Sequence, residues 1–237
     1  MMQVKHVVIL GLSALLLVLL VAAAAGKQQR AAILGQDISI HRPGDHQFVL
    51  RSEIEKVLPK WEAMPIREIN THLLEEKLEN HPAILRAEVY CSLNQRLQIE
   101  VWQHKPLARF FGSPDRQYLL TEGKVMPVTA HYSAEAPLLT GQWPDSLHRP
   151  LAKFLELLER EAHWQGFFNG VHRDAEGDWW LYPRAGGRKV RLGQAENLER
   201  KMRKLAVFYR QAGDKKTLEE METIDLRFEN QVICKRL

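Results

Sequence analysis

An uncharged apolar segment near the start of the chain places the strongest constraint on its fold. Nineteen consecutive residues, from Val7 to Ala25, carry no charge. A helix of that length rises about 28 Å, close to the roughly 30 Å thickness of the hydrocarbon core of a bilayer. A cleaved secretory signal is the alternative, but its apolar core usually has only about 7 to 15 residues. The sequence therefore predicts a membrane-spanning helix over Val7–Gly26 after a tail of residues 1–6, and the flanking charges leave its orientation open.

Beyond this segment the chain has the composition of a folded protein. Of its 237 residues, 45% are hydrophobic and 26% are charged, which excludes a disordered chain and a multi-span transporter and leaves room for two small domains. The net charge of +4 is modest. Basic residues gather between Arg184 and Arg210, but Glu196 and Glu199 lie among them. This pattern favours a solvated helix face, or attraction to anionic lipid, over a nucleic-acid surface.

The cysteine content limits the covalent and metal chemistry. Cys91 and Cys234 are the two cysteines of the sequence and lie 143 positions apart. This spacing gives no disulfide framework and no close cysteine pair for a metal. Because their surroundings indicate different domains, we expect both thiols to be buried and unpaired, while one long-range bridge stays compatible with an extracytoplasmic location.

The segment after the apolar run has the periodicities of a β-α-α-β-β unit. Ser52 and Glu55 have the spacing of a capping box, and Asn70 is a favourable N-cap. The expected elements are a strand ending at Ile38-Ser39-Ile40, a helix after Ser52 that stops at Pro59, a helix from Asn70 to Asn80, and strands over Ile84–Leu93 and Leu97–Trp102.

The second half alternates short β-like runs with two helical stretches. Pairs at Glu122-Gly123, Glu176-Gly177 and Gly186-Gly187 predict hairpin turns. This order predicts an α+β fold in which helices cover one face of a mostly antiparallel sheet. The expected helices are Leu151–Ala162 and Leu198–Ala212, and the expected strands are Tyr118–Leu120, Lys124–Met126, Phe167–His172, Trp179–Tyr182, Lys189–Leu192, Ile224–Phe228 and Gln231–Cys234.

The sequence offers no recognisable catalytic or cofactor-binding motif. It lacks the zinc-helix, nucleophile-elbow and phosphate-loop patterns. His41 and His46 have no third ligand at an obvious spacing, so we expect scattered surface histidines. Trp179 and Trp180 could stack on a sugar, but neighbouring strand residues point to opposite faces, so one ring is expected in the core. We therefore expect no catalytic residue, no cofactor, no metal and no small-molecule substrate.

One span has a specific resemblance to a known family. Residues Ile69–Phe110 contain His81-Pro82, then Ala87-Glu88-Val89, the alternation Leu97-x-Ile99-x-Val101 and the run Lys105-Pro106-Leu107-Ala108-Arg109. In this combination they resemble the POTRA module of the FtsQ/DivIB family of bacterial cell-division proteins. Later stretches that resemble the same family are Glu122–Pro127, Pro137–Gly141, Arg188–Gly193 and Ile224–Phe228.

The resemblance implies a domain order, a location and a role. It implies a POTRA domain over residues 31–105 and an FtsQ-type β domain over residues 106–237. It also implies a non-enzymatic, single-pass protein of the cell inner membrane, with a cytoplasmic N-terminus, a periplasmic bulk and enrichment at the division septum. The implied partners are FtsB and FtsL-like divisome proteins, and the implied role is control of septal peptidoglycan synthesis through protein–protein binding.

The last β-like run indicates how such a partner would bind. We expect the final strand at a sheet edge, where its outer N–H and C=O groups can accept another strand. The alternative is a strand inside the sheet, or one blunted by Lys235 and Arg236, and the family resemblance favours the edge. The expected partner-binding residues are Phe228, Gln231, Val232, Ile233, Cys234 and Lys235.

Two other classes of protein stay open on the residues alone. A membrane-anchored cell-wall hydrolase or sugar-binding protein is suggested by the paired tryptophans and by acidic residues. A POTRA-bearing component of a translocation machine is the third hypothesis, but such proteins usually carry a barrel or repeated modules, which the sequence does not indicate.

Overall fold

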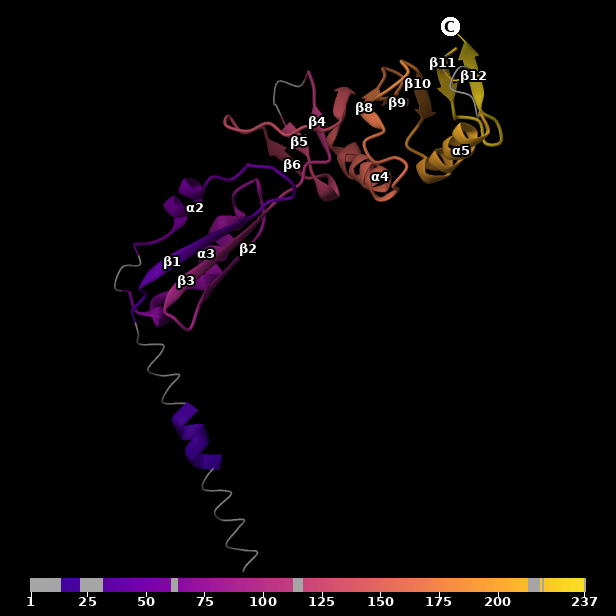
Figure 1. Ribbon diagram of the computed structural model, residues 1–237. Coiled ribbons are helices and arrows are strands. Elements are labelled where there is room, and N and C mark those ends of the chain that lie inside the picture. The colour runs from indigo at the N-terminus through magenta and orange to yellow at the C-terminus, as the bar shows by residue number, and fades with distance from the viewer. Residues whose placement is uncertain are drawn as a thin grey trace, which may run out of the picture. The chain divides into compact units, whose positions relative to one another are not determined.

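The chain forms two compact units, which divide between His104 and Lys105. A computed structural model describes residues 14–21, 32–60, 64–112, 117–212, 218 and 220–236 (Figure 1). The first unit contains a three-stranded sheet and the second a nine-stranded sheet. This mixture of helices and sheets agrees with the predicted α+β class. Each unit is described by itself below.

The predicted membrane-spanning segment lies mostly outside the described residues. Residues 14–21 form a helix whose leucine and valine side chains are exposed. The rest of Val7–Gly26, and the tail of residues 1–6, fall outside the described ranges. Within those ranges, no helix has both the length and the apolar character needed to cross a membrane.

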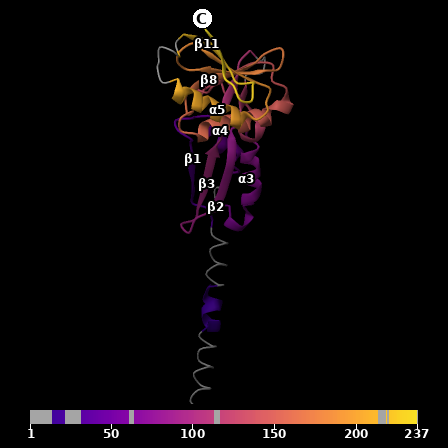
Figure 2. The same ribbon diagram turned by 90° about the vertical axis from the view of Figure 1, so that its right-hand side faces the viewer.

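The first unit has the β-α-α-β-β order that the sequence predicts. The central strand β3 is parallel to β1 on one side and antiparallel to β2 on the other. Leu97, Ile99 and Val101 of β3 are fully buried, and α3 packs alongside β2 (Figure 2). The elements are β1 (Gly35–His41), α2 (Arg51–Val57), a 3-10 turn (Ile66–Glu68), α3 (Thr71–Glu79), β2 (Ile84–Cys91) and β3 (Arg96–Gln103).

Helices α2 and α3 begin in different ways. Asn70 caps α3 as predicted, because its Oδ1 accepts a hydrogen bond from the Leu73 N–H at 3.0 Å. The predicted capping box of Ser52 and Glu55 is wrong. The N-cap of α2 is Leu50, two residues before Ser52, and Glu53 Oε2 accepts from the Leu50 N–H at 2.8 Å. Glu55 instead forms an ion pair with Arg51, one turn before it on the exposed face.

The side chains of α3 close the outer edge of β2. The Val89 N–H donates to Glu75 Oε1 at 2.8 Å, and the Ala87 N–H donates to Glu79 Oε1 at 3.0 Å. Strand β2 is at one end of the sheet order, so these N–H groups would otherwise be open to another strand. Two carboxylates one helical turn apart on α3 therefore accept hydrogen bonds from two N–H groups that lie two residues apart on β2. We call this pair of residues the β2 guard.

Removal of the β2 guard should destabilise the first unit and expose its edge. For Glu75→Ala together with Glu79→Ala, we expect the free energy of unfolding to fall by about 1 to 3 kcal/mol, because two hydrogen bonds to charged acceptors are lost. We also expect concentration-dependent dimers in size-exclusion chromatography. Glu76→Ala is the matched control, because this carboxylate lies on the same helix and pairs with His72, at 3.6 Å, instead of with β2. Monomers of unchanged stability for the double variant would contradict the guard.

In its described residues, the second unit is one mixed sheet with two long α-helices, α4 and α5. Its strand order is β12-β11-β10-β9-β8-β7-β4-β5-β6. Most pairings are antiparallel as predicted, but β4 with β7, β7 with β8, and β10 with β11 are parallel. The elements are β4 (Ala108–Phe110), β5 (Gln117–Leu119), β6 (Val125–Pro127), β7 (Leu138–Gly141), α4 (His148–Arg160), β8 (Phe168–Arg173), β9 (Trp179–Pro183), β10 (Lys189–Gly193), α5 (Leu198–Gln211), β11 (Met221–Asp225) and β12 (Ile233–Arg236).

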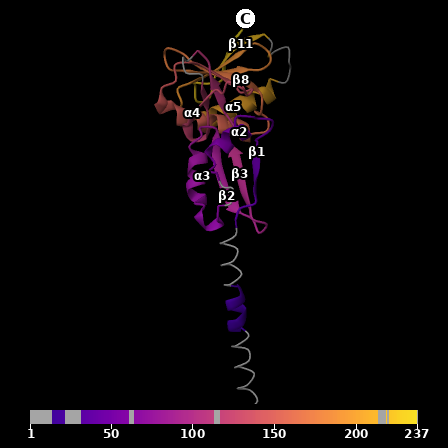
Figure 3. The same cartoon turned by 90° about the vertical axis from the view of Figure 1, so that its left-hand side faces the viewer.

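The helices explain two of the three parallel pairings. Helix α4 connects β7 to β8 and helix α5 connects β10 to β11, and a crossover of this kind returns the chain parallel to its starting strand. Both helices lie on the same side of the sheet (Figures 2 and 3). Leu155 of α4 and Leu205 of α5 share one buried cluster with Leu181, Val190 and Ile224 of the sheet. Among the described residues, no long α-helix lies on the opposite face of the sheet, which we call the helix-free face (Figures 2 and 3).

The predicted hairpins between β5 and β6, β8 and β9, and β9 and β10 are all present. The first of them requires its glycine. Gly123 has φ +80°, and a Cβ at this position would lie 2.5 Å from the backbone nitrogen of Arg149. This close approach brings the hairpin against the start of α4.

Candidate partner-binding edge

Strand β12 lies at one end of the nine-stranded sheet (Figure 1). It pairs antiparallel with β11, with Lys235 opposite Thr223 and Ile233 opposite Asp225. No other strand in the described part of the chain pairs with the far side of β12. The other end of this sheet is β6, which has only three residues and ends in Pro127, a residue without an N–H donor. Strand β12 is thus the edge of this sheet that can best accept another strand.

The predicted partner-binding residues divide between the strand and the loop before it. Ile233, Cys234 and Lys235 lie in β12, whereas Phe228, Gln231 and Val232 lie in the connection from β11. The predicted strands Ile224–Phe228 and Gln231–Cys234 are therefore too close to each other, because β11 ends at Asp225 and β12 begins at Ile233. Backbone carbonyls of Phe228 and Gln231 accept hydrogen bonds from Lys204 of α5 instead of joining the sheet.

Alternate residues of this segment face opposite sides of the sheet. Val232 and Cys234 pack against the buried cluster on the helix side. Ile233 is 45% exposed, and strand alternation points it to the helix-free face together with Lys235. Burial raises the pKa of the Cys234 thiol. Cys91 and Cys234 are both free, and each is half-buried rather than fully buried as expected.

One ion pair joins the two final strands, and a second lies at the end of β11. Lys235 Nζ lies 2.8 Å from Glu222 Oε2, which raises the pKa of Lys235 and lowers that of Glu222. Arg227 contacts both carboxylate oxygens of Asp225, with the shortest N···O distance 2.8 Å. Burial opposes the charged form of Asp225, but these hydrogen bonds from Arg227 lower its pKa. Both pairs sit within the β11–β12 hairpin, so they stabilise it without another chain.

A single row of paired residues crosses the helix-free face and ends at β12. Four of its members interact directly with a neighbour in the row, as two pairs. Thr140 Oγ1 is 2.9 Å from His172 Nδ1, and the Arg191 guanidinium lies 5.0 Å from the Trp180 ring centre. The row therefore joins the edge strand to the middle of the sheet. It consists of Thr140, His172, Trp180, Arg191, Asp225 and Ile233 on six successive strands.

The paired tryptophans are divided between the two faces, as the strand period predicts. Trp179 is 1% exposed and packs edge-on against Trp143 and Phe154 in the core. The Trp180 Nε1–H donates to Asp174 Oδ2 at 2.7 Å, and Arg191 lies over its ring. The Trp179 ring is thus part of the core, and one face of the Trp180 ring is covered by Arg191. This arrangement does not favour the sugar-stacking hypothesis.

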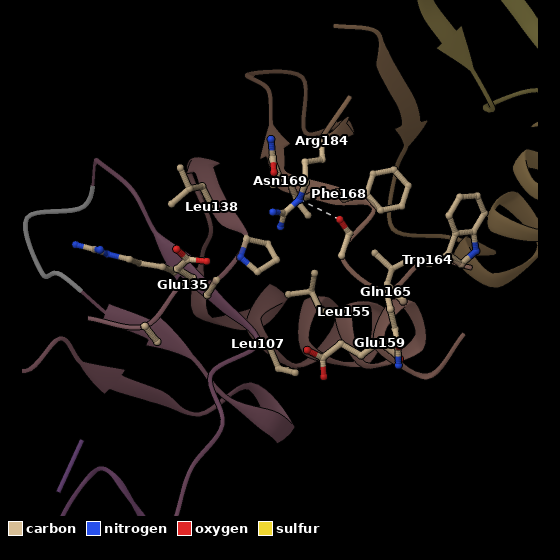
Figure 4. Close-up of a pocket in the computed structure, with 18 of the residues that line it drawn as sticks. Leu107, Glu135, Leu138, Leu155, Glu159, Trp164, Gln165, Phe168, Asn169 and Arg184 are labelled. Carbon is tan, nitrogen blue, oxygen red and sulfur yellow. Dashed lines mark hydrogen bonds between the residues drawn. The ribbon is translucent and has the colours of Figure 1, made fainter. Parts of the chain in front are cut away.

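A hollow of about 670 Å³ lies between α4 and the start of β8 (Figure 4). Its apolar wall includes Leu155 and Phe168, and Glu135 and Glu159 lie on different walls. Both oxygens of Glu159 accept from Lys105 Nζ, at 2.9 and 3.0 Å. Glu159 is therefore engaged in an ion pair, and this geometry gives no support for a pair of catalytic carboxylates.

The histidines singled out in the sequence make structural contacts. His41 Nε2 lies 3.0 Å from Glu100 Oε2, and its ring stacks on Trp102. His46 lies against Phe48. Within the described residue ranges, no group of three or more His, Cys, Asp and Glu side chains could hold a metal ion.

Sequence reasoning missed Lys204, which contacts the loop before β12. Its acceptors lie 22 to 27 residues later in the chain. The available signal was the position of Lys204 in α5, between the apolar residues Met202 and Leu205 that face the core. A lysine beside a buried face is often partly buried and needs hydrogen-bond acceptors. That signal does not identify the acceptors.

Comparisons with known proteins agree with the division into two units. A family model described as FtsQ/DivIB, C-terminal related, matches residues 105–235, and a POTRA-like domain model matches residues 35–102. The cell division protein FtsQ of Rhodothermus marinus is 30% identical over 181 residues. The match covers 71% of this chain and 66% of the relative, just under two thirds of its length.

Proposed function

Since the chain belongs to the FtsQ/DivIB family of cell-division proteins, we propose that it is a non-enzymatic assembly protein of the divisome. In this role it links membrane and periplasmic division proteins, and it controls septal peptidoglycan synthesis by binding them. The POTRA domain contributes to recruitment, and the β domain binds the partner. We propose FtsB and FtsL-like proteins as the partners.

The observation that supports this proposal most is the open edge of β12. The strand is paired on one side, and Ile233 is exposed on the helix-free face. An extended partner segment would form main-chain hydrogen bonds with the free side, and its alternate side chains would lie beside Ile233 and Lys235 on one face and Cys234 on the other. By contrast, the β2 guard occupies the corresponding edge of the POTRA domain.

The proposed location follows from the same role. The segment Val7–Gly26 anchors the chain in the inner membrane, with the N-terminus in the cytoplasm and both folded units in the periplasm. The apolar length of this segment supports the anchor. Enrichment at the division septum completes the proposal.

Hydrogen exchange with the full-length chain in lipid nanodiscs tests the partner-binding role. We expect addition of the extracytoplasmic segments of the FtsB and FtsL homologues of the same genome to slow exchange of the amides of residues 233–236. The amides of β6 serve as the control and should not change. Depletion of the chain in cells should give filaments. Protection confined to other strands would reject the β12 edge, and cleavage of peptidoglycan by the purified chain would reject the non-enzymatic role.

A further inference from the structure

The ammonium group of Lys204 is surrounded by backbone carbonyls of the β11–β12 connection. Lys204 Nζ donates to Leu226 O at 3.0 Å and to Gln231 O at 3.1 Å, and it also contacts Phe228 O. A lysine ammonium has three N–H donors and no acceptor. All three donors are therefore directed at one seven-residue loop, Leu226 to Val232. We call Lys204 with these three carbonyls the lysine clamp.

The clamp joins this loop to a part of the fold that is firmly packed. Helix α5 buries Met202 and Leu205, on either side of Lys204, in the core cluster of the second unit. Leu226, at the start of the loop, is fully buried as well. Arg200, one turn earlier on α5, adds a contact of 3.1 Å to Glu229 at the tip of the loop. The helix therefore holds both the base and the tip of the connection.

The position of the clamped carbonyls fixes where β12 begins. Leu226 follows directly after the last residue of β11, and Gln231 lies two residues before the first residue of β12. Binding both carbonyls to one nitrogen sets the distance between the ends of the two strands. The first pair of the hairpin, Asp225 opposite Ile233, lies immediately beyond. In a hairpin, the geometry of the connection selects the register, and a slip by one residue would turn Ile233 to the other face.

We propose that Lys204 is a positioning residue for partner binding, which acts by fixing the register and order of β12 through the three loop carbonyls. This proposal rests on the function proposed above, because it gives Lys204 a role in binding through the edge strand. Lys204 need not contact the partner itself. Its removal leaves three carbonyls without their shared donor and frees the loop, so the edge strand is presented in several arrangements instead of one.

The test compares Lys204→Met with Lys201→Met in the full-length chain. Lys201 lies on the same helix and bonds a different loop, through Gln194 O at 3.0 Å, so its variant removes the same charge without affecting the clamp. For Lys204→Met we expect amide exchange in residues 226–236 to accelerate about tenfold or more, while the amides of α4 and the midpoint of global unfolding change little. We expect binding of the FtsB-homologue segment to weaken roughly tenfold. Lys201→Met should leave both quantities within about twofold of the original chain.

The outcomes separate this inference from the function on which it rests. Unchanged exchange in residues 226–236 of Lys204→Met would overturn the clamp, and equal weakening of binding by both variants would overturn it in favour of a general charge effect. Faster exchange without any partner binding by the original chain would leave the clamp in place and reject the proposed function. If Lys204→Met unfolds globally, Lys204→Gln, which keeps two donors, replaces it, and the same criteria apply.

Discussion

Replacement of Ile233 with lysine is expected to weaken binding of the partner strand by about 30-fold or more, the loss of a typical hot-spot residue. Ile233 is the exposed apolar side chain of the edge strand, so a strand that adds to β12 would cover it. A lysine at this position places a charge where an apolar contact forms, and lysines on edge strands discourage strand addition. The folded chain should tolerate the change, because Asp225 lies directly opposite and has the complementary charge.

Ile233→Val is the matched control for this experiment. Valine keeps the branched apolar surface and the strand preference, so we expect binding within about threefold of the original chain. Calorimetric titration with the FtsB-homologue segment measures both variants, and circular dichroism establishes that both are folded. Cells that carry Ile233→Lys as their only copy should form filaments. If a folded Ile233→Lys chain bound the partner as tightly as the original chain, Ile233 would not be part of the proposed interface.

Replacement of Trp179 with alanine is expected to have the largest effect on stability. Its ring is almost fully buried, and its centre lies 5.1 Å from that of Trp143 and 6.0 Å from that of Phe154. Truncation leaves a cavity under α4 that rigid neighbours cannot fill. We expect a loss of about 3 to 5 kcal/mol in the free energy of unfolding of the second unit, measured by urea titration with circular dichroism.

The adjacent Trp180 provides the control for Trp179. Its ring is half-buried on the helix-free face, where it loses one hydrogen bond to Asp174 and the contact with Arg191 on truncation. We expect Trp180→Ala to cost only about 1 kcal/mol. Equal losses for the two variants would mean that the helix-free face is covered to the same extent as the core. The comparison also bears on the hydrolase hypothesis, since a sugar that stacks on Trp180 would be lost with this variant alone.

The sequence predicts the structure best where the spacing of apolar residues in a segment matches the pattern of side chains that the fold buries. The alternation at Leu97, Ile99 and Val101 predicts β3, and all three side chains are fully buried. The leucine spacing of α4 and the apolar face of α5 predict those helices within a few residues. Each of these elements packs its own apolar pattern against the core, so local pattern and final structure coincide.

The sequence was less informative where distant residues decide the outcome. Strands β4 and β7 have three and four residues, too few for a period to be visible, and their parallel pairing depends on segments that intervene between them. The limits of β11 and β12 depend on Lys204, which takes up carbonyls that the local pattern assigns to strands. For the candidate site, alternation identifies Ile233, but the contacts that hold its strand come from a helix more than twenty residues away.

The β2 guard blocks strand addition at the edge of the POTRA sheet only while α3 remains helical. Glu75 and Glu79 are one turn apart on a helix of nine residues, so fraying of that helix withdraws both carboxylates together. Such opening needs far less free energy than complete unfolding. Stored samples of this protein should therefore begin to aggregate at temperatures well below the melting transition, at a rate set by how often α3 unwinds.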